Sequence, residues 1–187
     1  MDRVELRKRV DDLAIEPDRL RRRLVALGAL TARLEPEGIE PILVGGCALE
    51  VYTEGGYSTS DVDLALPSTP SVDAAFADLG FQKRGRFWVR PELELFFEAP
   101  APPGLPGETA PRLELDVGGL RVVILGVEDL LVDRMRAWVH WKSVEDGRWA
   151  TRLAALYASK LDWDYLRSRA VDAEERSALE RLKEGAR

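Results

Sequence analysis

Residues 43–66 constrain the fold of this chain more than any other stretch, because they combine a diglycine turn with an acidic strand. Residues 41–44 form a short apolar run bounded by turn residues, as a buried strand would, and Gly45 and Gly46 allow a tight turn after it. A helix can begin near Cys47, and backbone N–H groups at its start form a ready site for phosphate oxygens. The segment therefore predicts a strand, a turn and a helix that together can hold an anion.

A second strand is predicted at residues 61–66, where polar and apolar residues alternate with a period of two. Asp61 and Asp63 project from the same face of such a strand, where two carboxylates can share a divalent cation. The two halves of the stretch together predict a site for phosphate and metal.

These motifs resemble the signature of the minimal nucleotidyltransferases of the DNA polymerase β-like superfamily. That signature is an apolar strand, Gly-Gly or Gly-Ser, a helix, and Asp-x-Asp on the next strand. Residues 44–46 match its first half and residues 61–63 match its second half. Thr59 also suits the pattern, whereas Tyr57 stands where these proteins often carry an arginine.

The resemblance covers most of residues 43–166 and is greatest to small bacterial proteins of abortive-infection and toxin–antitoxin systems. It implies an α+β fold in which a mixed β-sheet is flanked by helices. It also implies that a nucleoside monophosphate moves from a nucleoside triphosphate (NTP) to an acceptor hydroxyl on a protein, an RNA end or a small molecule. Mg²⁺ or Mn²⁺ is the implied cofactor, and a cognate antitoxin protein is the implied partner.

The superfamily places a third metal carboxylate on a strand that follows the Asp-x-Asp strand. Residues 93–98 alternate as a strand would, and Glu98 at the end of this predicted strand is the first candidate. Glu94, on the same predicted face, is the second candidate, and Glu114 or Asp116 in a later strand is the third. Each of these acids can instead be the solvent-facing half of an amphipathic strand.

The expected nucleotide contacts follow from the same resemblance. Backbone N–H groups of Gly45, Gly46 and Cys47 would cradle the β- and γ-phosphates, and Thr59 or Ser60 would orient them. The thiol of Cys47 is expected to pack inside the protein rather than to act as a nucleophile.

Three further features have both a functional and a structural interpretation. Arg134, on the first helix of the C-terminal part, is a candidate phosphate contact by resemblance, and pairing with nearby acids is the alternative. His140 is the single histidine, and without a partner at metal-ligand spacing it is expected to be structural or exposed. An arginine cluster near the N-terminus can contact phosphate or simply form a solvated helix face; its members are Arg19, Arg21, Arg22 and Arg23.

Length and composition limit the partners. The 187 residues are 45% hydrophobic and 32% charged, which predicts a folded domain with helical extensions. A net charge of −6 argues against an extensive nucleic-acid surface, and a single cysteine excludes a disulfide framework within the chain. A charged N-terminus and the absence of a long apolar run predict a cytoplasmic protein without membrane contact.

The sequence pattern divides the chain into three predicted parts. They are an N-terminal helical segment at residues 1–38, a nucleotidyltransferase-like α/β core at 39–126 and a C-terminal helical region at 127–187. The proline-rich residues 99–110 predict an irregular loop, which either covers the site or simply connects two strands.

Two alternatives to a catalytic function stay open. The first is a non-catalytic nucleotide- or partner-binding member of the same fold, which an incomplete carboxylate triad would favour. The second is a structural α+β domain in which the glycines and aspartates are ordinary turn and strand residues. The presence of Asp61 and Asp63 on one strand face favours the enzyme over both.

Overall fold

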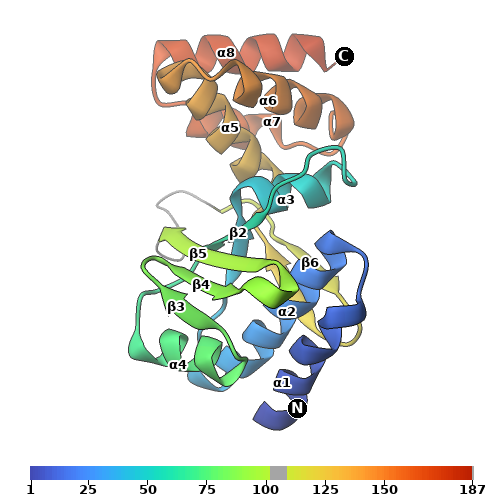
Figure 1. The fold of residues 1–187 in the computed structure, drawn as a ribbon. Coiled ribbons are helices and arrows are strands. Elements are labelled where there is room, and N and C mark those ends of the chain that lie inside the picture. Colours follow the sequence, from blue (N-terminus) through green and yellow to red (C-terminus); the bar gives the residue numbers. More distant parts are fainter. Residues whose placement is uncertain (102–108, 187) are drawn as a thin grey trace. The chain divides into compact units, whose positions relative to one another are not determined.

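The computed structural model describes residues 1–101 and 109–186, and its chain divides into two compact units (Figure 1). Unit 1 comprises residues 1–101 and 113–124 of the described chain and contains the β-sheet, whereas unit 2 comprises residues 109–112 and 125–186 and is helical. No helix in these described ranges is long and apolar enough to cross a membrane.

Two helices open unit 1, α1 (Arg3–Asp11) and α2 (Arg19–Leu34), with a short 3-10 helix, η1 (Asp12–Ile15), between them. Each α-helix begins after an aspartate whose carboxylate accepts a hydrogen bond from a backbone amide of the first turn: Asp2 for α1 and Asp18 for α2. Helix α2 buries one leucine-rich face in the core of unit 1. The apolar spacing in the sequence thus becomes the packed face of a helix.

In the described part of the chain, seven strands form one mixed sheet in the order β3-β4-β5-β2-β1-β7-β6. Strand β2 lies between β1, to which it is antiparallel, and β5, to which it is parallel. The strands are β1 (Ile42–Val44), β2 (Asp61–Ala65), β3 (Gln82–Arg84), β4 (Phe87–Arg90), β5 (Leu95–Ala101), β6 (Leu113–Asp116) and β7 (Arg121–Ile124). The predicted mixed sheet with flanking helices is confirmed.

Helices α3 (Gly45–Tyr52) and α4 (Pro70–Asp78) and the 3-10 helix η3 (Pro91–Leu93) lie between strands, and the 3-10 helix η2 (Glu35–Glu37) joins α2 to β1. Helix α4 places Phe76 against the sheet, where its ring stacks on Trp88 at 4.4 Å and meets Phe97 edge-on at 5.6 Å. Leu95 and Phe97 of β5 are fully buried on this core face. Alternation along the strand therefore turns Phe96 and Glu98 to the opposite face.

Strand β5 differs from its prediction at both ends. Pro91 opens the 3-10 helix η3, and Glu94 ends it in the left-handed region at φ +54°, so the strand begins at Leu95 rather than at residue 93. The strand then continues to Ala101, into the segment predicted to be a loop. The rest of the predicted cover or connection falls on residues 102–108, outside the described residues.

Unit 2 contains four helices: α5 (Val127–Trp141), α6 (Val144–Leu156), α7 (Trp163–Arg169) and α8 (Ala173–Gly185). The last three are capped by side chains of Ser143, Asp162 and Asp172. The buried carboxylate of Asp129 on α5 accepts hydrogen bonds from Tyr165 and Arg169 of α7, which fastens these two helices together.

Candidate metal and nucleotide site

Three carboxylates gather on one face of the sheet in unit 1. Asp61 and Asp63 lie two residues apart on β2, and Asp63 is directly opposite Glu98 in the parallel pairing of β2 with β5. Neighbouring strands are about 4.8 Å apart, and paired residues of parallel strands point to the same side. Glu98, the first candidate for the third carboxylate, therefore stands beside the Asp-x-Asp pair.

The burial pattern separates this acidic face from the core. Val62 and Leu64, which alternate with the two aspartates, are fully buried. Asp61 is exposed, Asp63 is half-buried, and the Glu98 side chain is 12% exposed. The acids thus line a partly sheltered surface that solvent and ions can reach.

The diglycine turn packs directly against Asp63. Gly45 has a left-handed backbone, with φ +63°, and a Cβ atom built there would lie 2.3 Å from Asp63 Oδ2. Only glycine combines this conformation with so close an approach to a carboxylate. A Cβ on Gly46 would lie 3.1 Å from the Tyr57 ring and 3.3 Å from Thr59 Cβ. The first half of the motif is thus in contact with the second.

Helix α3 begins within this turn, at Gly45, and not near Cys47 as predicted. The physical reason is the glycine itself, because its freedom of φ lets the chain pass from strand β1 into the helix without an intervening residue. Cys47 is fully buried, and burial raises the pKa of its thiol to about 12. The thiol is therefore a packing group, as predicted, and only the backbone of Cys47 can serve a ligand.

Two hydroxyl residues precede β2, as the sequence indicates. Ser60 Oγ donates a hydrogen bond to Asp61 Oδ1 at 2.8 Å, and Thr59 Oγ1 accepts one from the Asp61 amide at 3.4 Å. The position of this segment is fixed by Arg23 of α2, whose guanidinium donates to the Thr59 carbonyl oxygen at 2.7 Å. The same guanidinium donates to both oxygens of the buried Glu50 on α3, each at 2.9 Å. Arg23 thus ties two helices to the start of the Asp-x-Asp strand.

The donor set fits a hard divalent cation. Carboxylate oxygens are the ligands that Mg²⁺ and Mn²⁺ prefer, and the absence of a side chain at Gly45 lets the glycine turn pack directly against Asp63. Asp61, Asp63 and Glu98 are the residues that would hold the ion.

Arg86 is a site neighbour that the sequence pattern does not reveal. Its Nε lies 2.9 Å from Glu98 Oε2, and its side chain is 74% exposed. The hairpin around Gly85 is predictable, but the pairing of β4 with β5, which sets Phe87 opposite Glu98 across the 3-10 helix η3, does not follow from the local pattern. Arg86 neutralises the charge of Glu98, and because its side chain is mostly in solvent it can move away when a cation binds.

The other acidic candidates lie apart from this cluster. Glu94 precedes β5, and its carboxylate pairs with Arg19 and Arg22 of α2. Glu114 and Asp116 lie on β6, which is separated from β2 by β1 and β7. None of these three acids is paired with Asp63 across neighbouring strands, as Glu98 is.

Arg134 belongs to unit 2, on helix α5. Its guanidinium donates to Asp146 Oδ1 at 2.7 Å and also pairs with Asp133. These contacts match the structural interpretation of Arg134, and its contact with phosphate stays a prediction.

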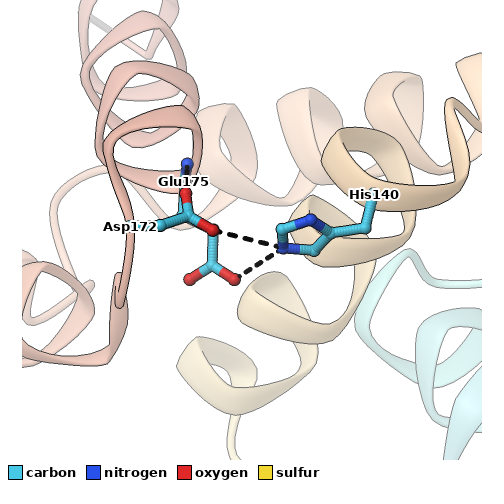
Figure 2. A group of neighbouring side chains, drawn as sticks. All are labelled: His140, Asp172 and Glu175. Carbon is cyan, nitrogen blue, oxygen red and sulfur yellow. Dashed lines mark hydrogen bonds and ion pairs between the residues drawn. The ribbon is translucent and has the colours of Figure 1, made fainter.

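His140, also in unit 2, lies beside two acids that the sequence spacing does not reveal. Its Nε2 is 2.9 Å from Glu175 Oε1 and 3.8 Å from Asp172 Oδ2 (Figure 2). The side-chain ligand atoms of the three residues lie within 4.8 Å of one another. However, Glu175 Oε1 also accepts a hydrogen bond from Arg136 Nε at 3.1 Å, so a cation already occupies that oxygen. The cluster therefore acts as an ionic link between α5 and α8.

No protein-family profile and no curated protein matches this chain. Among solved structures, the chain is similar to an antigenic nucleotidyltransferase-like protein from Paracoccidioides brasiliensis, with a TM-score of 0.62 and 17% sequence identity. The likeness covers 90% of this chain and 88% of that one. This chain therefore has a nucleotidyltransferase-like fold.

Proposed function

We propose that the protein is a metal-dependent nucleotidyltransferase, which moves a nucleoside monophosphate from an NTP to an acceptor hydroxyl. The observation that carries the proposal is the pairing of Asp63 with Glu98, which adds a third carboxylate to the Asp-x-Asp pair. The close contact of Gly45 with Asp63 supports it, because it joins the phosphate-binding half of the motif to the metal-binding half.

Each group in the site has a distinct task in this reaction. Asp61, Asp63 and Glu98 would hold one or two Mg²⁺ or Mn²⁺ ions, which would lower the charge cost of bringing an oxygen nucleophile to the α-phosphorus. Backbone N–H groups from Gly45 to Cys47 hold the β- and γ-phosphates.

Hydroxyls next to the Asp-x-Asp strand complete the phosphate contacts. Ser60 donates to Asp61, and Thr59 lies against Gly46. These contacts support a role for Thr59 or Ser60 in orienting the triphosphate between the glycine turn and the carboxylates.

The proposed transfer is an in-line displacement at the α-phosphorus. The acceptor oxygen forms a bond to the α-phosphorus while the bond from that phosphorus to the β-phosphate oxygen breaks. Pyrophosphate leaves, and one of the three carboxylates accepts the acceptor's proton. The nucleotidylated acceptor is the second product.

Incubation with α-labelled NTPs, Mg²⁺ and candidate acceptors tests the proposal. Label should move to an acceptor with the wild-type protein, and Asp63→Asn should abolish the transfer without unfolding the protein. Equal transfer by the wild type and Asp63→Asn would overturn the proposal. Binding can be followed in parallel, because a ligand at a hundred times its Kd adds about 2.7 kcal/mol to the free energy of unfolding.

A second candidate function is a non-catalytic nucleotide- or partner-binding protein of the same fold. The ion pair between Arg86 and Glu98 favours it, because a guanidinium there can replace the charge of a metal. Under this hypothesis NTPs would bind without divalent cation and no label would be transferred. A cognate antitoxin as the partner stays a prediction from the sequence resemblance.

A further inference from the structure

A cavity of about 440 Å³ lies in unit 1 at the end of the acidic face. A volume of this size is typical of small-ligand sites. Arginines of α2 form one wall, and hydroxyl residues before β2 form another. The cavity is lined by Arg19, Arg22, Arg23, Ser58, Thr59, Ser60, Glu94 and Phe96.

The charges that line the cavity leave an excess of one positive charge. Arg23 is matched by the buried Glu50, and its guanidinium is fully engaged. Arg19 and Arg22, in contrast, share a single carboxylate, that of Glu94. Two guanidinium groups facing one carboxylate attract an anion.

The two arginines differ in how firmly they are held. Arg22 is fixed by hydrogen bonds to the carbonyl oxygens of Leu93 at 2.9 Å and Glu16 at 2.8 Å. Arg19 is 75% exposed, and among the described residues its guanidinium contacts only Glu94, at 3.4 Å. One arginine is therefore preorganised, and the other has donors to offer a ligand.

The cavity borders the proposed metal site. Ser60, on its wall, donates to Asp61 Oδ1 at 2.8 Å. Phe96, also on its wall, pairs with Asp61 across the strands and lines a second hollow of about 290 Å³ that includes Asp61. A molecule anchored by the arginines can thus lie along Phe96 and reach the carboxylates.

We infer that this cavity binds a phosphate group of a small-molecule acceptor, with Arg19 and Arg22 as the phosphate contacts. The inference rests on the proposed function for the identity of the ligand as an acceptor. It assigns a purpose to Arg19 and Arg22 of α2, which have no role in the proposed metal site. The proposed NTP contacts are backbone groups of the glycine turn and the acceptor contacts are the two arginines, while Thr59 and Ser60 border both sites.

Binding of inorganic phosphate in the absence of divalent metal tests the site directly. Titration calorimetry at constant ionic strength, balanced with chloride, should show that Arg19→Ala weakens phosphate binding about five- to tenfold, as expected for loss of a charged hydrogen bond. Glu94→Gln should tighten it about threefold, because the competing carboxylate is removed. Arg3→Ala, an exposed arginine of α1 paired with Asp78, is the matched control and should leave the affinity unchanged.

A second titration, with NTP and Mg²⁺, identifies the source of the phosphate. Arg19→Ala should leave NTP affinity unchanged, and an equal loss for NTP and phosphate would overturn the assignment to the acceptor. Phosphate affinity that is absent, or unchanged in Arg19→Ala, would overturn the inference whatever the result with NTP. If the wild-type protein does not bind NTP but binds phosphate through Arg19, the proposed function is contradicted and the phosphate site is supported.

Discussion

Gly45 shows how one residue links the two halves of the site. Gly45→Ala places a methyl group against Asp63 in a backbone that alanine rarely adopts. We expect it to lower the free energy of unfolding by about 3 kcal/mol, of which about 1 kcal/mol is backbone strain and the rest is the clash. Urea unfolding measures this loss.

Gly38→Ala is the matched control for this change. Gly38 has a similar φ of +68°, but a Cβ there meets nothing within 4 Å, so this variant should lose only about 1 kcal/mol. Equal decreases in the free energy of unfolding for the two variants would show that a side chain at position 45 does not clash with Asp63.

Arg86 is the residue whose removal should improve metal binding. Its guanidinium competes with a cation for Glu98, and exposed pairs of this kind contribute up to about 1 kcal/mol. Arg86→Ala should therefore tighten Mn²⁺ binding by as much as about fivefold in calorimetry. Weaker binding in this variant would mean that Arg86 helps the site instead of competing with it.

At the scale of elements, the buried pair of Arg23 and Glu50 joins α2 and α3 to the start of β2. Glu50→Gln leaves the charge of Arg23 buried and uncompensated, which should reduce the free energy of unfolding by about 3 kcal/mol. Because Arg23 also holds the Thr59 carbonyl, the same variant should weaken NTP binding. Chemical unfolding and NTP titration check the two effects, and an unchanged stability would exclude a structural role for the pair.

Helices α5 and α8 are joined by a link that depends on pH. Burial works to raise the pKa of Glu175, but hydrogen bonds from His140 and the Val171 amide, with the charge of Arg136, hold this pKa below its usual value. A carboxyl with a lowered pKa in the folded state stabilises that state above its ordinary pKa. This stabilisation is lost as the pH falls from the ordinary pKa of the carboxyl group towards its lower pKa in the folded state.

Glu175→Gln tests this link. The variant should be less stable than the wild type by about 2 kcal/mol at pH 7, and the difference should shrink below about pH 4.5. Thermal unfolding across pH 3 to 7 measures it, with the exposed neighbour Glu174→Gln as the control. A difference that is constant with pH would contradict the assignment.

For the whole molecule, local patterns predict the fold better than the site. Residues 43–66 contain the strand, the turn and the acidic pair within one continuous segment, so period and spacing suffice to place them. Glu98 joins them only through the pairing of β2 with β5, a contact between strands distant in sequence. Local alternation also predicts that Glu94 lies in the strand, whereas Glu94 ends the 3-10 helix that begins at Pro91.

The arginine cluster illustrates the same limit. The sequence identifies Arg19 to Arg23 as basic but assigns no partner, because the partners Glu50, Thr59 and Glu94 come from three later segments. Tertiary packing gives neighbouring arginines different roles. Arg23 is buried and joins α2 to Glu50 and Thr59, whereas Arg19 is exposed and lines the cavity.

The most direct test of the central claim is a Mn²⁺ titration that compares Glu98→Gln with Asp63→Asn and Glu94→Gln. If Asp61, Asp63 and Glu98 hold one metal site, Glu98→Gln and Asp63→Asn should each weaken Mn²⁺ binding about tenfold or more. Glu94→Gln, whose carboxylate pairs with Arg19 and Arg22, should bind Mn²⁺ like the wild type. Wild-type affinity in Glu98→Gln would contradict the account.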